Sequence, residues 1–172
     1  QFSILLLGQH FTIEEPWSQI KKLLQVNCDR DIFLSALNAK AETTQSRILI
    51  LIDAINEGEG KKLWKNYIAG FVTAVKKFPN IGVVFSVRTS YEKLLIPKSL
   101  KERREIIRVV HQGFANHEYE ASKFFFENFG IKQPSIPLLH PEFSNPLFLK
   151  LFCDGLHKKG LQEIPDGYEG IT

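Results

Sequence analysis

The sequence contains no methionine, little cysteine and no long apolar run. Only Cys28 and Cys153 occur among its 172 residues, far apart and without metal-ligand spacing, so neither a disulfide framework nor a zinc site is indicated. No apolar run approaches the roughly 20 residues that are needed to cross a bilayer. We therefore expect two free thiols, no membrane insertion and a reducing compartment, with cytoplasm as the default.

Strong charge of one sign and several defining motifs are also missing. The net charge is +3, and no aromatic residue is interleaved in the one basic cluster, between Lys98 and Arg108, so we expect a solvated surface there and no nucleic-acid binding. The five histidines lack metal-ligand spacing, and there is no G-x-S-x-G elbow. The pattern G-x-x-x-x-G-K-[ST] does not occur either, so the usual backbone cradle for nucleotide phosphates is absent.

The most informative stretch that is present is ILILIDAINEG, residues 48–58, an apolar run that ends on an acid. Its apolar residues do not alternate with polar ones, which predicts a parallel strand covered on both faces. Ligands bind beyond the carboxyl ends of such strands, so Asp53 is placed to hold Mg²⁺ through water and Glu57 to accept a proton from an attacking water. This is the Walker B arrangement. The alternative is a buried strand that merely ends at a turn.

A second apolar run, IGVVFSVRTSYE at residues 81–92, also ends in polar residues, with Arg88 directly after it. The planar guanidinium of Arg88 is suited to a γ-phosphate or to the charge on its leaving group. The competing interpretation is a surface arginine that pairs with Glu92 or another acid.

The periodicity of the chain predicts an α/β core followed by helices. Strands are expected over 2–7, 48–53, 105–111 and from Ile81 to just before Arg88, and helices from Pro16, over 29–41 and from Leu63 to near Phe78. Beyond residue 114 only helices are expected, over 117–129 and 146–159. We thus divide the chain into a parallel α/β core at 1–113 and a helical segment at 114–172.

The order of QFSILLLGQHF, PWSQIKKLL, ILILIDAINEG, VVFSVRTSYE and FSNPLFLKLFCDGL resembles the NTPase module of STAND-type signalling ATPases, which is related to NACHT modules, and particularly that of bacterial antiviral (Avs-like) proteins. The resemblance implies an ASCE-type P-loop NTPase sheet flanked by helices, the start of a helical lid, and the cofactors ATP and Mg²⁺. It assigns magnesium to Asp53, hydrolysis to Glu57 and a sensor role to Arg88. Asn56 replaces the first of the two acids in the NACHT pattern, and we expect it to contact the nucleotide as Asp53 and Arg88 do. The Asn145-Pro146 pair sits where a lid proline approaches the base.

From these features we expect the central part of an ATP-binding, slowly hydrolysing signalling switch in prokaryotic antiviral defence. We expect it to be cut from a longer protein whose P-loop precedes Gln1, and to be inactive alone. The resemblance further implies homo-oligomerisation on activation and a phage-protein ligand bound through other regions. Two alternatives stay open: a non-catalytic protein-interaction scaffold, and a magnesium-dependent nuclease using Asp53 and Glu57, which is disfavoured because no acid-x-lysine arrangement follows.

Overall fold

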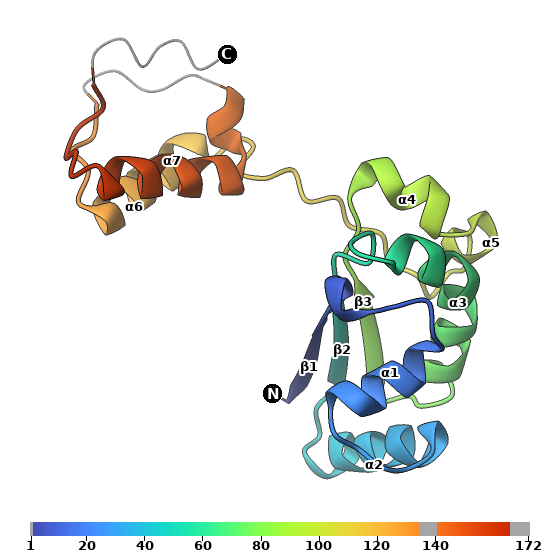
Figure 1. Ribbon diagram of the computed structural model, residues 1–172. Helices are drawn as coiled ribbons and strands as arrows, with labels where there is room; N and C mark the ends of the chain where they lie inside the picture. The colour runs from blue at the N-terminus through green and yellow to red at the C-terminus, as the bar shows by residue number, and fades with distance from the viewer. Residues whose placement is uncertain (1, 135–140, 166–172) are drawn as a thin grey trace. The chain divides into compact units, whose positions relative to one another are not determined.

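The structure, a computed structural model, describes residues 2–134 and 141–165, and the chain forms two compact units (Figure 1). The first unit is Gln1–Arg108 and the second is Val109–Thr172. The division falls after Arg108, whereas the sequence places it after residue 113.

A three-stranded parallel sheet forms the centre of the first unit (Figure 1). Its strands are β1 (Ser3–Leu7), β2 (Ile48–Asp53) and β3 (Ile81–Phe85), and they lie side by side in chain order. Leu7 is paired with Asp53, so the carboxyl ends of β1 and β2 lie level. The predicted parallel α/β class is confirmed, and Asp53 is the last residue of its strand.

Helices connect these strands and extend the first unit beyond β3. They are α1 (Pro16–Leu23), α2 (Arg30–Thr43), α3 (Gly60–Val75), α4 (Thr89–Leu95) and α5 (Lys98–Lys101). Pro16 occupies the first turn of α1, where its missing N–H removes no hydrogen bond. The first three helices were predicted within a few residues, whereas α4 and α5 were not predicted.

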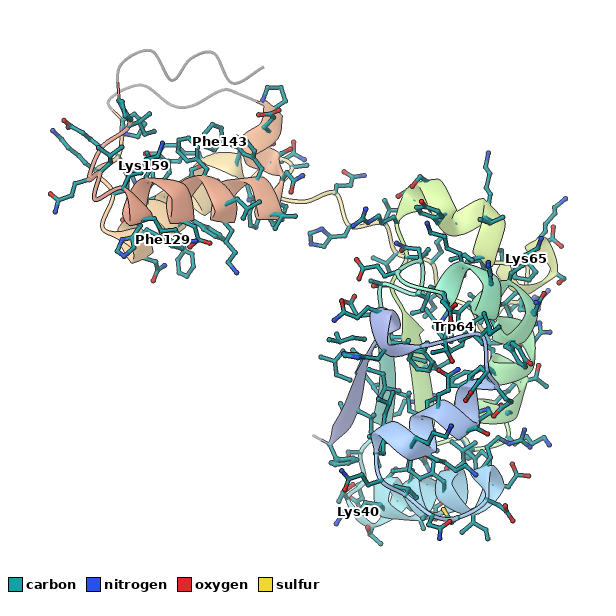
Figure 2. The ribbon with its side chains drawn as sticks, viewed as in Figure 1. Lys40, Trp64, Lys65, Phe129, Phe143 and Lys159 are labelled. Atoms are coloured by element: carbon teal, nitrogen blue, oxygen red, sulfur yellow. The ribbon has the colours of Figure 1, made fainter. Side chains whose placement is uncertain are left out.

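The helices cover one face of the sheet and leave the other face exposed. Ile4, Leu6, Ile50 and Ile52 are buried in the core, where aromatic rings from α1 and α3 pack, including Trp64 (Figure 2). The alternate residues form what we call the open sheet face: Leu5, Leu7, Leu49, Leu51 and Val84. In register, Leu5 lies beside Leu51 and Leu51 beside Val84, while Leu5 is 64% exposed. The prediction that both faces are covered is therefore wrong for the described residues.

The geometry of parallel connections explains this one-sided arrangement. Crossovers between parallel strands are right-handed in nearly all proteins. When three strands follow one another in one direction across a sheet, such crossovers place all the connecting helices on the same face. The strand sequences cannot reveal this, because ILILI has the same composition whether its second face is covered or bare.

The predicted strand at 105–111 is wrong, since the structure assigns no strand to these residues. Ile107 and Val109 are 87% and 83% exposed. An ion-pair cluster holds this segment instead: Arg108 Nε and Nη2 each donate to the Glu92 carboxylate at 2.8 Å, and Lys101 Nζ lies 3.1 Å from Glu92 Oε1. Hydrogen bonds from Arg108 and then Lys101 lower the pKa of Glu92 to about 2. The segment is thus held against α4 by charge, without strand pairing.

The second unit has its own small core between helices, as predicted. Its elements are α6 (Glu118–Phe129), the 3₁₀ helix η2 (Pro141–Ser144) and α7 (Pro146–Lys158). Phe126, Leu149 and Cys153 are fully buried there, with Phe143 and Phe129 packed around them (Figure 2). Burial, and secondarily the charge of Asp154, raises the pKa of the Cys153 thiol to about 11.

Candidate functional site

The candidate site lies where the carboxyl ends of the three strands meet their following loops. β1 continues directly into a 3₁₀ turn, η1 (Gly8–His10), which packs against the loop after β2. A Cβ atom on Gly8 would lie only 2.2 Å from the Ala54 carbonyl oxygen, so only glycine fits at this approach. Ala54 itself has a positive φ of 52°. The backbone is therefore tightly packed directly beside Asp53.

Asp53 is held in place by Ser86, the first residue after β3. The Ser86 hydroxyl donates a hydrogen bond to Asp53 Oδ1, and the same hydroxyl oxygen accepts one from the Ala54 N–H at 2.7 Å. Asp53 is exposed, and strand alternation places it on the side of Leu51, at the edge of the open sheet face. Ser86 was not predicted, although it is the first polar residue after its apolar run, as Asp53 is.

Asn56 joins the loop after β2 to the exit of β3. Its side chain is 3% exposed, and Asn56 Oδ1 accepts a hydrogen bond from the backbone N–H of Arg88 at 2.9 Å. The N–H of Ile55 donates to the Ser86 carbonyl at 3.0 Å in the same region. Asn56 thus has a structural role that fixes the position of Arg88, and its predicted contact with a nucleotide stays a prediction.

Glu57 and Arg88 face each other across the two loop ends. Arg88 Nη2 lies 3.6 Å from Glu57 Oε1, and the Arg88 side chain is 71% exposed. A charge-assisted hydrogen bond is usually about 2.7–2.9 Å long, so this pair is loose. Glu92, the other partner considered for Arg88, binds Arg108 and Lys101 instead. The structure therefore brings together two of the three residues of the predicted hydrolytic site.

A hollow of about 370 Å³ opens beside this pair, and we call it the Glu57–Arg88 hollow. Its lining residues come from the ends of all three strands and from α3 and α4: Gln9, Asn56, Glu57, Gly58, Lys61, Arg88 and Tyr91. Asp53 is not among these lining residues. Lys61 and Tyr91 were not predicted, because only the fold brings the first turn of α3 next to α4.

Asn145 and Pro146 form the start of α7 in the second unit. Asn145 Oδ1 accepts hydrogen bonds from the N–H groups of Leu147 at 3.0 Å and Phe148 at 3.3 Å, and Pro146 fills the first helical position. Both residues are explained as a helix N-cap and first turn. Their approach to a nucleotide base stays a prediction.

The acids at the site are too few to form a metal cage. Across residues 2–134 and 141–165, no group of three or more histidine, cysteine, aspartate or glutamate side chains is close enough to hold a metal ion. One exposed carboxylate such as Asp53 suits Mg²⁺, which is usually bound by one or two carboxylates, waters and phosphate oxygens.

Comparison with known proteins identifies no family for this chain. No family model matches the sequence, and no curated protein matches it. In the described part of the chain, no helix has the length and apolar character needed to span a bilayer.

Proposed function

We propose that this chain is the central part of an ATP-dependent signalling switch of the STAND type, acting in prokaryotic antiviral defence. The observation that carries the proposal is the placement of Asp53, Glu57 and Arg88 at the carboxyl ends of two adjacent parallel strands. Open α/β sheets bind ligands at this edge. An acid for a cation, an acid for water and a cation for phosphate are the groups that phosphoryl transfer to water requires.

Each residue has a distinct role in this proposal. Ser86 uses one oxygen of Asp53, so the other can accept a hydrogen bond from water on a magnesium ion. Glu57 accepts the proton of the attacking water, and Arg88 offsets charge that develops on the phosphate. Magnesium bound with the triphosphate would supply further charge neutralisation.

The open sheet face supports the proposal of a further strand and helix that bind phosphate. In this proposal the further strand pairs with the outer edge of β3, and its helix leads back across the sheet to β1. This connection crosses the sheet in the opposite direction to the connections from β1 to β2 and from β2 to β3. A right-handed crossover would then put its helix on the open sheet face. This face offers the apolar row Leu5, Leu51 and Val84, and Asp53 lies on the same side. In the STAND pattern, such a strand and helix carry the P-loop.

The second unit is then the start of the helical lid. Bound ATP would favour one orientation of the lid relative to the sheet, and hydrolysis or exchange would shift the population to another. In the longer protein we expect homo-oligomerisation on activation and slow turnover, because a switch needs a long-lived bound state. A phage protein bound by other regions is the proposed trigger.

The proposal is tested by Glu57→Gln in the longer protein that carries a P-loop. We expect ATP hydrolysis to fall by about 100-fold or more while ATP binding persists, because glutamine cannot accept the proton. The matched control is Glu59→Gln, which removes an exposed acid two residues along the same loop. Hydrolysis at the wild-type rate in Glu57→Gln would remove Glu57 from the catalytic role.

The 172-residue chain alone provides a second check on the same proposal. Without the glycine-rich cradle it should bind ATP only weakly and should not hydrolyse it. Micromolar affinity measured by calorimetry would contradict the idea that most phosphate contacts lie in a missing P-loop.

A non-catalytic interaction scaffold is the second candidate, and exposed apolar side chains favour it. Phe124, Leu147 and Leu151 on α6 and α7 are 64%, 63% and 59% exposed, which is typical of surfaces that bind proteins when such residues form a patch. An ATP titration of the longer protein separates the two candidates. If wild type and Asp53→Ala had equal ATP affinity and the same oligomer distribution, the scaffold would be favoured.

A further inference from the structure

The Glu57–Arg88 hollow contains more positive than negative charge. Lys61 and Arg88 line it with cationic groups, and Glu57 is its one acidic lining residue. The two cations come from different elements, the first turn of α3 and the exit of β3. A hollow of about 370 Å³ is near the lower end of the range for small-molecule sites. Its size therefore suits one phosphate group and the atoms bonded next to it in the ligand.

Lys61 is positioned at the hollow by an aromatic ring. Its ammonium nitrogen lies 4.6 Å from the centroid of the Tyr91 ring, within the range of a cation–π contact. Among the residues that the structure describes, no carboxylate forms an ion pair with Lys61. Its charge is therefore not neutralised by an acid and can interact with an added anion.

Arg88 can turn to an anion at little cost. Its contact with Glu57 is long at 3.6 Å, and exposed ion pairs of this kind contribute little to stability. The backbone of Arg88 is fixed by Asn56, so only the side chain has to move. A planar guanidinium then offers two parallel N–H groups to phosphate oxygens.

Two uncharged residues also line the hollow. These are Gln9 and Gly58, and Gly58 has a positive φ of 55°. Within the described residues the N–H of Gly58 donates no backbone hydrogen bond. Backbone N–H groups in loops of this kind commonly bind anions.

We propose that the Glu57–Arg88 hollow binds the terminal phosphate of a polyphosphate chain, with Lys61 and Arg88 as its two cationic ligands and Tyr91 positioning Lys61. This inference rests on the proposed function for the nature of the ligand. It adds Lys61, Tyr91 and Gln9, none of which has a role in the hydrolytic site described above.

The test uses the 172-residue chain and inorganic triphosphate, followed by amide chemical shifts in NMR spectra. We expect weak, saturable binding, with the largest shifts at Gln9, Gly58 and Lys61. Lys61→Ala and Arg88→Ala should each weaken binding by about fivefold or more, because each removes a direct charge contact. The matched control is Lys62→Ala, which removes the same charge from the same turn of α3 but does not line the hollow.

Substitutions of Tyr91 test how Lys61 is positioned. Tyr91→Phe keeps the aromatic ring and should keep the triphosphate affinity of the wild type. Tyr91→Leu removes the ring and should lower the triphosphate affinity toward that of Lys61→Ala. Unchanged amide shifts in the sheet show that each variant is folded. Equal triphosphate affinity in Lys61→Ala and Lys62→Ala, or shifts confined to other parts of the chain, would overturn the inference.

The outcome is separate from that of the Glu57 experiment. If Lys61→Ala binds triphosphate like wild type while Glu57→Gln abolishes hydrolysis, this inference fails and the proposed function stands. If Lys61→Ala weakens binding while Glu57→Gln hydrolyses ATP normally, the anion site stands and the proposed hydrolytic role is lost.

Discussion

Asn56 decides the geometry of the site although its side chain is out of reach of solvent. Its amide oxygen accepts the hydrogen bond of the Arg88 N–H and so links the loop that carries Glu57 to the loop that carries Arg88. An acid at this position, as in the NACHT pattern, would bury a charge in the same place. Asparagine provides the acceptor without that cost.

We predict that Asn56→Ala lowers the free energy of unfolding of the first unit by about 1–3 kcal/mol, because the Arg88 N–H loses its partner. Both tryptophans, Trp17 and Trp64, lie in this unit, so fluorescence during urea unfolding measures it directly. The control is Asn66→Ala on α3, whose exposed side chain makes a 3.4 Å contact with the Lys62 carbonyl. Equal effects of the two substitutions would contradict the structural role of Asn56.

Single residues could be predicted from the sequence only where a strand ends. Asp53 and Arg88 each follow an apolar run, and the carboxyl ends of parallel strands define a binding edge, so the sequence indicates both. Ser86 and Lys61 depend on neighbours that are distant in sequence. The bond from Ser86 to Asp53 requires the register in which Ile52 pairs with Phe85, and that register is a property of the assembled sheet.

Apolar runs in the sequence predict three strands correctly and a fourth one wrongly. Apolar runs located β1, β2 and β3 within one or two residues. The run at 105–111 has the same β-branched character but is no strand, because Arg108 within it is bound to Glu92 of α4 and the run pairs with none of the three strands. Helices α4 and α5 were missed because seven and four residues are too few for a helical period to be recognised.

We predict that Leu6→Thr and Leu5→Thr, neighbours in β1, differ sharply in stability. Leu6 is 5% exposed in the core, so its replacement should cost about 3 kcal/mol, whereas Leu5 on the open sheet face should change stability by no more than about 0.5 kcal/mol. Urea unfolding followed by tryptophan fluorescence measures both. A large loss of stability in Leu5→Thr would mean that the open sheet face is covered in solution.

At the scale of the whole molecule, each unit carries its own core and one cysteine. Cys28 packs against the core of the first unit, and Cys153 is buried in the core of the second. The sequence indicated the change from α/β to helical structure but could not place the boundary at Arg108. Arg108, the last residue of the first unit, forms an ion pair with Glu92 of α4, a contact between residues distant in sequence.

We predict that thiol labelling reports the two units separately. Leu34→Ala should speed the labelling of Cys28 alone and Leu149→Ala that of Cys153 alone, because each leucine is fully buried in one core and its loss costs about 2–5 kcal/mol. Mass spectrometry of the labelled chain at increasing urea measures both rates. If either substitution accelerated both thiols equally, the chain would unfold as one cooperative body.

The chain-order pairing of β1, β2 and β3 has a consequence for how the first unit forms. Each strand pairs with the strand next to it along the chain, so every pairing closes a single crossover and spans fewer residues than a pairing that skipped a strand would. Folding rates of small domains rise as the sequence separation of the contacts falls. The sheet can therefore grow strand by strand from its amino-terminal edge while the remainder of the polypeptide is still being synthesised.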